Sequence, residues 1–305
     1  MKFIKPVTVT DSILTASSIP EPDTGEVVWN AGTAYALNDK AYRATTHMIY
    51  NRIVAGTTAT PPEDDDTNWE EFYPTNKWAM FDTRSNTVSV ETGASAVEIE
   101  VTLVPGQVIS SLYLGELDAT GVQVVMKDTP GGTTVYDETY SLDDEELFDW
   151  YMYFFEPINR KQSLVVNDLP AYGAGELTIT IRSDVSVQVG QCVIGQVYEL
   201  GVTEYGASAG IRDFSRIVEN SGTGVIQVEE RRYSKTMRAR FKIDEDRANY
   251  VHRQLTSVLR TPVVWIADND AGLEPLIIYG FYKDFSLDVA YPTISYYSLE
   301  VEGLS

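Results

Sequence analysis

The segment VSVETGASAVEIEVTLVPG, residues 88–106, alternates apolar and polar side chains and ends in a Pro-Gly pair. The apolar residues recur at every second position, which is the period of a strand with one buried face: Val97, Ile99, Val101 and Leu103. The Pro-Gly pair indicates a turn. This segment therefore predicts a β-strand that passes through a short turn into the next element.

Similar strand-like segments occur throughout the region from about Lys77 to Gly195. Runs such as TGVQVVMKDT (120–129), ELTITIRS (176–183) and VSVQVGQCVIG (185–195) are short and separated by turn-forming residues. Such a series predicts a β-sandwich. With Trp78-Ala-Met-Phe-Asp82 at its start, the region resembles a galactose-binding-like jelly roll. The resemblance implies a jelly roll over residues 75–195, with contact sites on its loops or with a purely structural role.

One segment of this region, DDEELFDWYMYFFEPI (143–158), is typical of a helix instead. Acidic residues occupy its first turn, and its apolar side chains recur at helical spacing: Leu147, Trp150, Tyr151, Phe154 and Phe155. We expect this face to pack against the sandwich. The alternative is an aromatic face that binds a partner.

From about Gln196 the chain changes character and ends in longer strands around one clear helix, DEDRANYVHRQLTSVLR (244–260). Asp244 is its candidate N-cap, and Pro262 disfavours continuation. Its apolar stripe comprises Ala248, Val251, Leu255, Val258 and Leu259. Residues 196–305 are therefore predicted to form a β-sandwich or split barrel with one helix.

The first ten residues, MKFIKPVTVT, predict a lone strand, and the linker SSIPEPDTGE (17–26) follows. A strand without a local partner is expected to complete a sheet elsewhere, here in the C-terminal domain. The predicted protein is mainly β and has four parts. These are a strand and linker (1–23), a small aromatic-rich β module (24–74), a jelly-roll sandwich (75–195) and a ring-forming β domain with one helix (196–305).

The module contains WNAGTAYALNDKAYRATTHMIYNRIVAGTTATPPEDDDTNW (29–69), which has many aromatic residues and no cysteine. So short a segment is not expected to bury all its rings, so several should lie near the surface, where rings stack on sugars. The order W…Y…(N)D…Y…Y…PP…W resembles chitin-binding-type carbohydrate-binding modules, with Asn38 in place of a turn glycine before Asp39. The resemblance implies candidate glycan contacts at Trp29, Tyr35, Tyr42, Tyr50 and Trp69. A purely structural insertion is the alternative.

The chain of 305 residues has 45 acidic and 23 basic residues, a formal charge of −22. Such a charge argues against nucleic acid and anionic membranes as partners. The N-terminus lacks the apolar region of a secretion signal, and no apolar run is long enough to span a membrane, so we expect synthesis in the cytoplasm and no membrane insertion. The acidic run Glu63–Asp66 is expected to be a solvated loop, because its spacing matches no calcium loop.

Catalytic and metal-binding patterns are missing from the sequence. The two histidines, His47 and His252, lie in no nucleophile context, and there is no CxxC or HExxH spacing. Cys192 is expected to be a small buried hydrophobe. We therefore predict no enzymatic activity, no metal and no cofactor. Paired carboxylates of a glycan hydrolase are the residual enzymatic alternative.

A basic group, Arg231–Arg232, Arg238 and Arg240, stands out in so acidic a chain. Arg238 and Arg240 alternate along a strand and would present a positive stripe to an acidic neighbour, while ordinary surface charge is the alternative. On the predicted helix, Tyr250, His252 and Arg253 would face a neighbouring copy. The candidate interface residues are thus Arg238, Arg240, Tyr250 and Arg253.

The order IRDFS…KTMRARFKI…helix…RTPVVWIAD…LIIYGFYKDFSLDV…YYSLEVEGL resembles tail-tip, distal tail and upper baseplate proteins of siphophages, as does the opening MKFIKPVTVTDSIL. The resemblance implies a structural virion protein that forms a homo-oligomeric ring at the tail tip. Its partners would be the tail tube, hub, neighbouring baseplate proteins and bacterial surface carbohydrate. The alternatives are a peripheral lectin-like adhesin and a glycan-active enzyme with an attached binding module.

Overall fold

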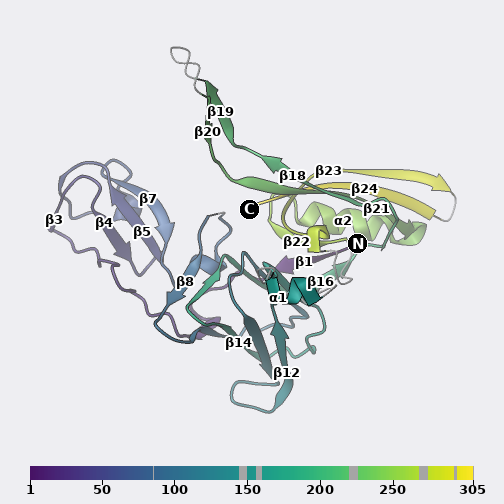
Figure 1. Cartoon of the computed structure of the whole chain (residues 1–305), viewed down its shortest axis with the longest axis horizontal. Coiled ribbons are helices and arrows are strands. Elements are labelled where there is room, and N and C mark those ends of the chain that lie inside the picture. Colours follow the sequence, from purple (N-terminus) through teal and green to yellow (C-terminus); the bar gives the residue numbers. More distant parts are fainter. Residues whose placement is uncertain are drawn as a thin grey trace.

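The computed structural model describes residues 1–84, 86–143, 150–155, 160–219, 226–267, 274–291 and 294–304. The described structure is 52% strand and 9% helical, which confirms the predicted mainly-β class. Figure 1 shows a body of packed sheets, a small lobe formed by the N-terminal module and a narrow arm that projects from the C-terminal strands. Among the described residues, no helix combines the length and the apolar character that crossing a membrane requires.

A curled antiparallel sheet of ten strands runs through the body. In spatial order its strands are β13 (Ser163–Val166), β10 (Ser111–Gly115), β16 (Gln191–Glu199), β1 (Lys2–Pro6), β22 (Val263–Ile266), β23 (Ile277–Tyr291), β24 (Ile294–Gly303), β21 (Tyr233–Asp244) and β17 (Val202–Thr203), and β18 (Ser208–Asp213) also pairs with β21. The predicted jelly-roll region and the C-terminal domain therefore share one sheet.

Strand β1 is the link between these two regions. It pairs with β22 along one edge and with β16 along the other. Phe3 packs in the core beneath the C-terminal helix, and Ile4 packs in a cluster on the opposite face of the sheet. Because both side chains are completely buried, β1 is covered on both faces. The expected lone strand thus completes the C-terminal sheet and also joins it to the jelly roll.

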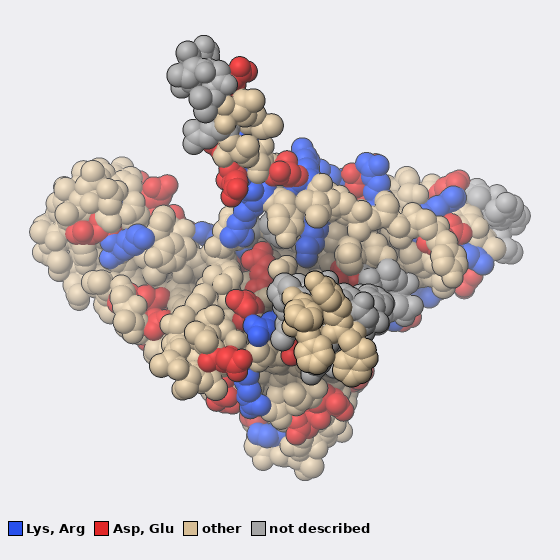
Figure 2. Space-filling view, viewed as in Figure 1, with Lys and Arg blue, Asp and Glu red and all other residues tan. Residues whose placement is uncertain are grey.

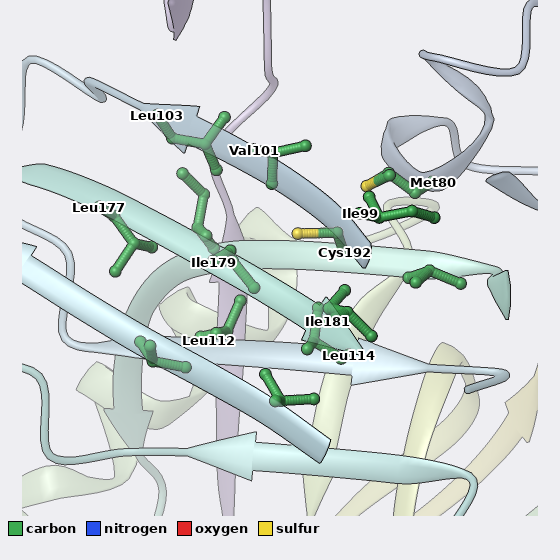
Figure 3. Close-up of a cluster of buried hydrophobic side chains, with 14 of the residues drawn as sticks. Met80, Ile99, Val101, Leu103, Leu112, Leu114, Leu177, Ile179, Ile181 and Cys192 are labelled. Atoms are coloured by element: carbon green, nitrogen blue, oxygen red, sulfur yellow. The ribbon is translucent and has the colours of Figure 1, made fainter. Parts of the chain in front are cut away.

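A second sheet packs on the jelly-roll part of the first. Its order is β12 (Thr134–Ser141), β11 (Gly121–Lys127), β14 (Glu176–Ser183), β9 (Val97–Leu103) and β2 (Leu14–Ser17), and β15 (Ser186–Val189) pairs with β8 (Ser89–Thr92) beside it. Figure 3 shows the core between these sheets, with the predicted inward residues Ile99, Val101 and Leu103 almost fully buried beside Cys192. Leu14 and Ile19 belong to the same core, so part of the predicted linker is structural.

The C-terminal helix α2 (Ala248–Ser257) follows a 3-10 turn at Glu245–Arg247. Val251, Leu255 and Val258 are buried against the sheet, as the stripe predicts. Two details of the prediction are wrong. Asp244 ends β21, and Arg247 occupies the N-cap position. Leu259 lies beyond the last residue of α2, Ser257, and is 53% exposed.

The module is built from two small sheets. One contains β4 (Lys40–Arg43), β5 (Met48–Arg52) and β7 (Trp69–Pro74), and the other pairs β3 (Ala34–Tyr35) with β6 (Gly56–Thr57). Asn38 adopts the left-handed conformation at φ 69°, the role predicted for it in place of glycine. Short 3-10 turns lie at Pro62–Asp64, at Ala79–Phe81 after the module, and at Glu274–Leu276 before β23.

Glu21 ties the module to the jelly roll. Its side chain is only 8% exposed, and its carboxylate accepts hydrogen bonds from Trp78 Nε1 (2.9 Å) and from the Thr75 hydroxyl (3.0 Å). His47 Nδ1 lies 2.9 Å from the same carboxylate, and the His47 ring stacks on Trp78 at 4.2 Å. His47, which comes from the module, therefore packs against the jelly roll at this junction.

We expect Glu21→Leu to lower the free energy of unfolding by about 1–3 kcal/mol, because it leaves the buried Trp78 N–H without an acceptor. The measurement is urea unfolding followed by tryptophan fluorescence. Asp11→Ala is the matched control. Asp11 contacts the other nitrogen of His47, but its side chain is 76% exposed, so its loss should cost less than about 0.5 kcal/mol. Equal effects of the two substitutions would contradict this account of the junction.

Candidate functional site

The structure buries all five candidate glycan-binding rings, each of which is at most 9% exposed: Trp29, Tyr35, Tyr42, Tyr50 and Trp69. All but Tyr42 belong to the core of the module. Trp69 packs edge-on against Tyr35 at 4.9 Å and beneath the guanidinium of the buried Arg52, also at 4.9 Å. The expectation that several of these rings lie near the surface is therefore wrong.

The rings are buried because other parts of the module fold over them. β3–β6 and β4–β5–β7 form two small layers, and the residues between β6 and β7 fold against them. Arg43 covers the Trp29 ring at 4.9 Å and pairs with Glu63 at 2.6 Å. Long cationic side chains thus complete a core that the apolar residues alone are too few to close.

The acidic run is part of this closure. Asp65 is 8% exposed and accepts hydrogen bonds from Thr58, Thr67 and Asn68. Hydrogen bonding, chiefly from Thr67, lowers the pKa of Asp65, so its carboxyl stays ionised. The prediction of a solvated loop is wrong for Glu63 and Asp65, because both carboxylates are occupied by partners within the module.

The exposed rings of the module are Phe72 and Tyr73 on β7, which sequence reasoning missed. They are 46% and 36% exposed, and their ring centroids lie 4.5 Å apart. The Lys40 ammonium lies 4.3 Å from the Phe72 ring centroid and 5.1 Å from that of Tyr73. In the sequence, the signal for these rings is the adjacent aromatic pair in WEEFYP. Both rings lie on β7, whose central four residues are exposed.

The four candidate interface residues do not form one surface. From Met237 to Ile243, the odd-numbered residues of β21 are buried in the core with α2, so Arg238 and Arg240 project from the opposite face of the sheet. Tyr250 and Arg253 lie on the exposed side of α2. Their role in subunit contact stays a prediction.

The arginine stripe is also neutralised within its own chain. Arg238 lies 3.2 Å from Glu300, and Arg240 lies 3.7 Å from Glu204 and 3.5 Å from Asp288. These carboxylates occupy the positions that an acidic neighbour would take. The stripe is therefore mostly a network of exposed ion pairs, which contribute little stability each.

The arm is formed by β19 (Arg216–Glu219) and β20 (Ile226–Glu229), which continue the β18–β21 hairpin beyond the body (Figure 1). Ile217 and Val228 are directly opposite each other and share one face of the arm with Ile226 and with Glu219, which lies opposite Ile226. The three side chains are 71%, 55% and 65% exposed, respectively. An apolar face on a two-stranded extension has no core of its own to cover it.

A second exposed apolar surface is helix α1 (Trp150–Phe155), the described part of the predicted helix; Leu147 lies outside the described residues. Four of its aromatic side chains are 65–78% exposed: Trp150, Tyr151, Phe154 and Phe155. They stack on each other in two pairs, Trp150 with Phe154 and Tyr151 with Phe155. The expectation that these four rings pack into the sandwich core is wrong, and the alternative, an aromatic face that binds a partner, stays a prediction.

Among the described residues, no group of three or more histidine, cysteine or acidic side chains that could hold a metal occurs. His252 contacts Phe285, and Cys192 lies in the jelly-roll core as predicted. Burial raises the pKa of the Cys192 thiol to about 12, so it stays protonated and unreactive at neutral pH.

Asp82 is the one described acid whose pKa burial raises to about 6. It accepts hydrogen bonds from the Arg84 backbone (3.0 Å) and the Thr87 hydroxyl (2.9 Å), while its buried Oδ2 has no partner among the described residues. Its ordinary pKa is 3.8, so the folded protein holds the proton more tightly than the unfolded chain. The carboxyl therefore lowers stability as the pH rises from 3.8 through about 6.

We expect Asp82→Asn to stabilise the protein at pH 8 by about 1–2 kcal/mol, allowing for solvent screening, and to have a much smaller effect near pH 4. Urea unfolding at the two pH values measures the difference. Asp184→Asn, which removes an exposed carboxyl, is the control and should change little at either pH. A gain from Asp82→Asn that is the same at both pH values would contradict the role given to its ionisation.

Comparison with known proteins identifies no relative: no model of a known family matches this chain, and no curated protein matches it. The candidate surfaces are therefore judged on their geometry. Three stand out, namely the exposed ring pair of the module, the apolar face of the arm and the aromatic face of α1.

Proposed function

We propose that this protein is a structural subunit of a bacteriophage tail tip or upper baseplate, where its copies assemble as a closed ring. The observation that carries the proposal is the arm, whose apolar face a single copy leaves exposed. The resemblance of the C-terminal order of elements to siphophage tail-tip proteins supports the same assignment. The expected location is the virion, and the expected neighbours are the tail tube, hub and other baseplate proteins.

A ring requires two different surfaces on each copy, because a head-to-tail contact repeats around an axis. The arm and the aromatic face of α1 fit this requirement. Figure 1 shows the arm extending away from the body, whereas α1 lies on the body itself. In the proposed assembly, the arm of one copy lies on the α1 face of the next.

The energetics support this pairing. Burying an aliphatic side chain the size of Ile217, Ile226 or Val228 contributes about 1.5–3 kcal/mol. Aromatic side chains such as those of α1 are enriched at the centres of protein interfaces. The contact must also overcome repulsion between copies that each carry a charge of −22, so an apolar interface suits it better than an ionic one.

Cross-linking tests the proposal. A chain carrying both Ile217→Cys and Phe155→Cys, treated with a short bis-maleimide, should give a ladder of covalent oligomers on a denaturing gel. The native Cys192 is buried and protonated, so it should not react. Each single variant serves as control and should give no ladder. Dimers from Ile217→Cys alone, without a ladder from the double variant, would show an arm-to-arm contact and overturn the head-to-tail ring.

A lectin-like adhesin is the second candidate, and one observation favours it. The exposed Phe72–Tyr73 pair with the Lys40 ammonium beside it has the composition of a sugar-stacking surface. Bacterial surface carbohydrate would then contact the module at this pair instead of at the five buried rings. An adhesin would be present as separate copies at the periphery of the particle, whereas the ring surrounds the tail axis.

A further inference from the structure

The curled sheet has a concave face that forms a groove beneath the arm. On β22, Val263 and Trp265 pack towards α2, whereas Val264 and Ile266 belong to a separate apolar cluster on the other face. Two adjoining hollows of about 350 and 550 Å³ lie along this side, and both are lined by Gln162, Ser163, Tyr233 and Lys235. Hollows of this size fit a small ligand or a few sugar rings.

The floor of the smaller hollow is aromatic and aliphatic. Tyr113 and Tyr279 lie side by side with ring centroids 6.2 Å apart, and Ile277 adjoins them. An added Cβ at Gly115 would lie 2.6 Å from the Tyr113 hydroxyl and 2.8 Å from the Gln191 side-chain oxygen. The glycine therefore leaves room for these two polar groups at the edge of the floor. Burial raises the pKa of both tyrosines, so their hydroxyls stay protonated and able to donate hydrogen bonds.

The wall of the groove is unusually basic for this chain. Arg231, Arg232 and Lys235 come from the base of the arm, and Arg160 enters from the jelly-roll side. Figure 2 shows lysine and arginine side chains gathered where the arm joins the body. Against these four cations, the described lining contains two carboxylates, Glu116 and Glu274. A local excess of positive charge on a chain of −22 favours an anionic ligand.

Two of the four cations have capacity to bind. Arg231 pairs with Glu229 at 3.6 Å, and Arg160 lies 3.5 Å from Asp143. Arg232 lies 3.9 Å from Glu116 across the groove, a loose contact, and the Lys235 ammonium makes no ion pair with any described side chain. Glu116 itself adopts a left-handed backbone conformation at φ 50°, which is uncommon for a residue other than glycine and frequent at binding sites. Amides from Gln162 and Gln191 complete the polar lining and match the hydroxyl groups of a sugar.

We infer that this groove binds an acidic glycan, with the sugar carboxylate held by Arg232 and Lys235 and the sugar hydroxyls facing the polar lining that includes the exposed Gln162. Side-chain amides hydrogen-bond sugar hydroxyls and peptide groups alike, so the experiment below compares an acidic glycan with an acidic peptide. The inference does not depend on ring assembly, because all the lining residues belong to one copy. The groove is also separate from the exposed Phe72–Tyr73 pair of the module, which has the Lys40 ammonium beside it.

The test uses an array of oligosaccharides that contain uronic or sialic acids beside their neutral counterparts, followed by titration calorimetry of any hit. We expect acidic members to bind, with affinity that falls as salt is added. The double variant Arg232→Gln/Lys235→Gln should weaken binding about tenfold or more. Arg238→Gln is the matched control, because it removes an exposed charge from the same strand outside the groove and should change affinity less than about twofold.

Three results would overturn the inference. The first is the absence of binding to every acidic member of the array. The second is binding that the groove variant leaves unchanged. The third is tighter binding of a hexaglutamate peptide than of any acidic glycan, which would show that the groove takes an acidic peptide instead. Circular dichroism of each variant checks that the fold is retained, which we expect because Arg232 is exposed and Lys235 is partly exposed.

Discussion

The chain that carries Ile217→Asp and Val228→Asp is expected to remain monomeric at concentrations where the wild-type protein forms rings. The two side chains face each other across the arm and are exposed in one copy, so the substitutions should not disturb the fold. In the ring they would place two carboxylates in an apolar contact. The loss should be about 3 kcal/mol or more, which is over a hundredfold in Kd.

Light scattering after size-exclusion chromatography measures this effect. The matched control is Arg216→Ala/Glu229→Ala, a directly opposed pair on the other face of the same two strands. This control should assemble as the wild type does. If the aspartate variant and the control behave alike, the apolar face of the arm is not the contact surface.

Trp69→Ala is expected to unfold the module while the rest of the protein stays folded. The Trp69 side chain is 2% exposed and contacts Tyr35 and Arg52, so its removal takes away the centre of a very small core. Loss of a buried tryptophan costs about 3–5 kcal/mol. A lobe with so few buried residues is not expected to tolerate that cost.

Limited proteolysis with mass spectrometry measures the change, as new cleavage sites between residues 24 and 74. Phe72→Ala on the same strand is the control, because Phe72 is 46% exposed and its loss should leave cleavage unchanged. Cleavage spread evenly over the chain in Trp69→Ala would contradict an independent module core.

Local sequence patterns were sufficient to predict much of the architecture. Period-two alternation placed Ile99, Val101 and Leu103 in the jelly-roll core, and helical spacing placed Val251 and Leu255 on the buried face of α2. These inferences succeed because they depend on a single element and the core that it faces. The two partners of β1 could not be predicted, since they come from residues 191–199 and 263–266, far away in the sequence.

Exposure was the harder quantity to predict from sequence. The segments 29–69 and 150–155 are both rich in aromatic residues, yet the rings of the first are buried, whereas Trp150, Tyr151, Phe154 and Phe155 of the second are exposed. The difference comes from Arg43, Arg52 and the acidic run, which close the module. Likewise Ile217 and Val228 alternate as core residues do, and only the three-dimensional arrangement shows that their face of the arm is exposed.

The ring and the groove are connected through one hairpin. The strands of the arm continue into β18 and β21, and the residues between β20 and β21, Arg231 and Arg232, line the groove. An arm held against a neighbouring copy would also fix the position of these two arginines. Assembly would in this way order the basic wall that we propose for the acidic glycan.

Electron cryomicroscopy of intact phage particles that carry this chain tests the central claim most directly. The account predicts a closed ring of copies around the tail axis at the distal end, with each arm lying on helix α1 of the next copy. Density for separate copies at the periphery of the particle, or particles that lack the chain, would contradict it.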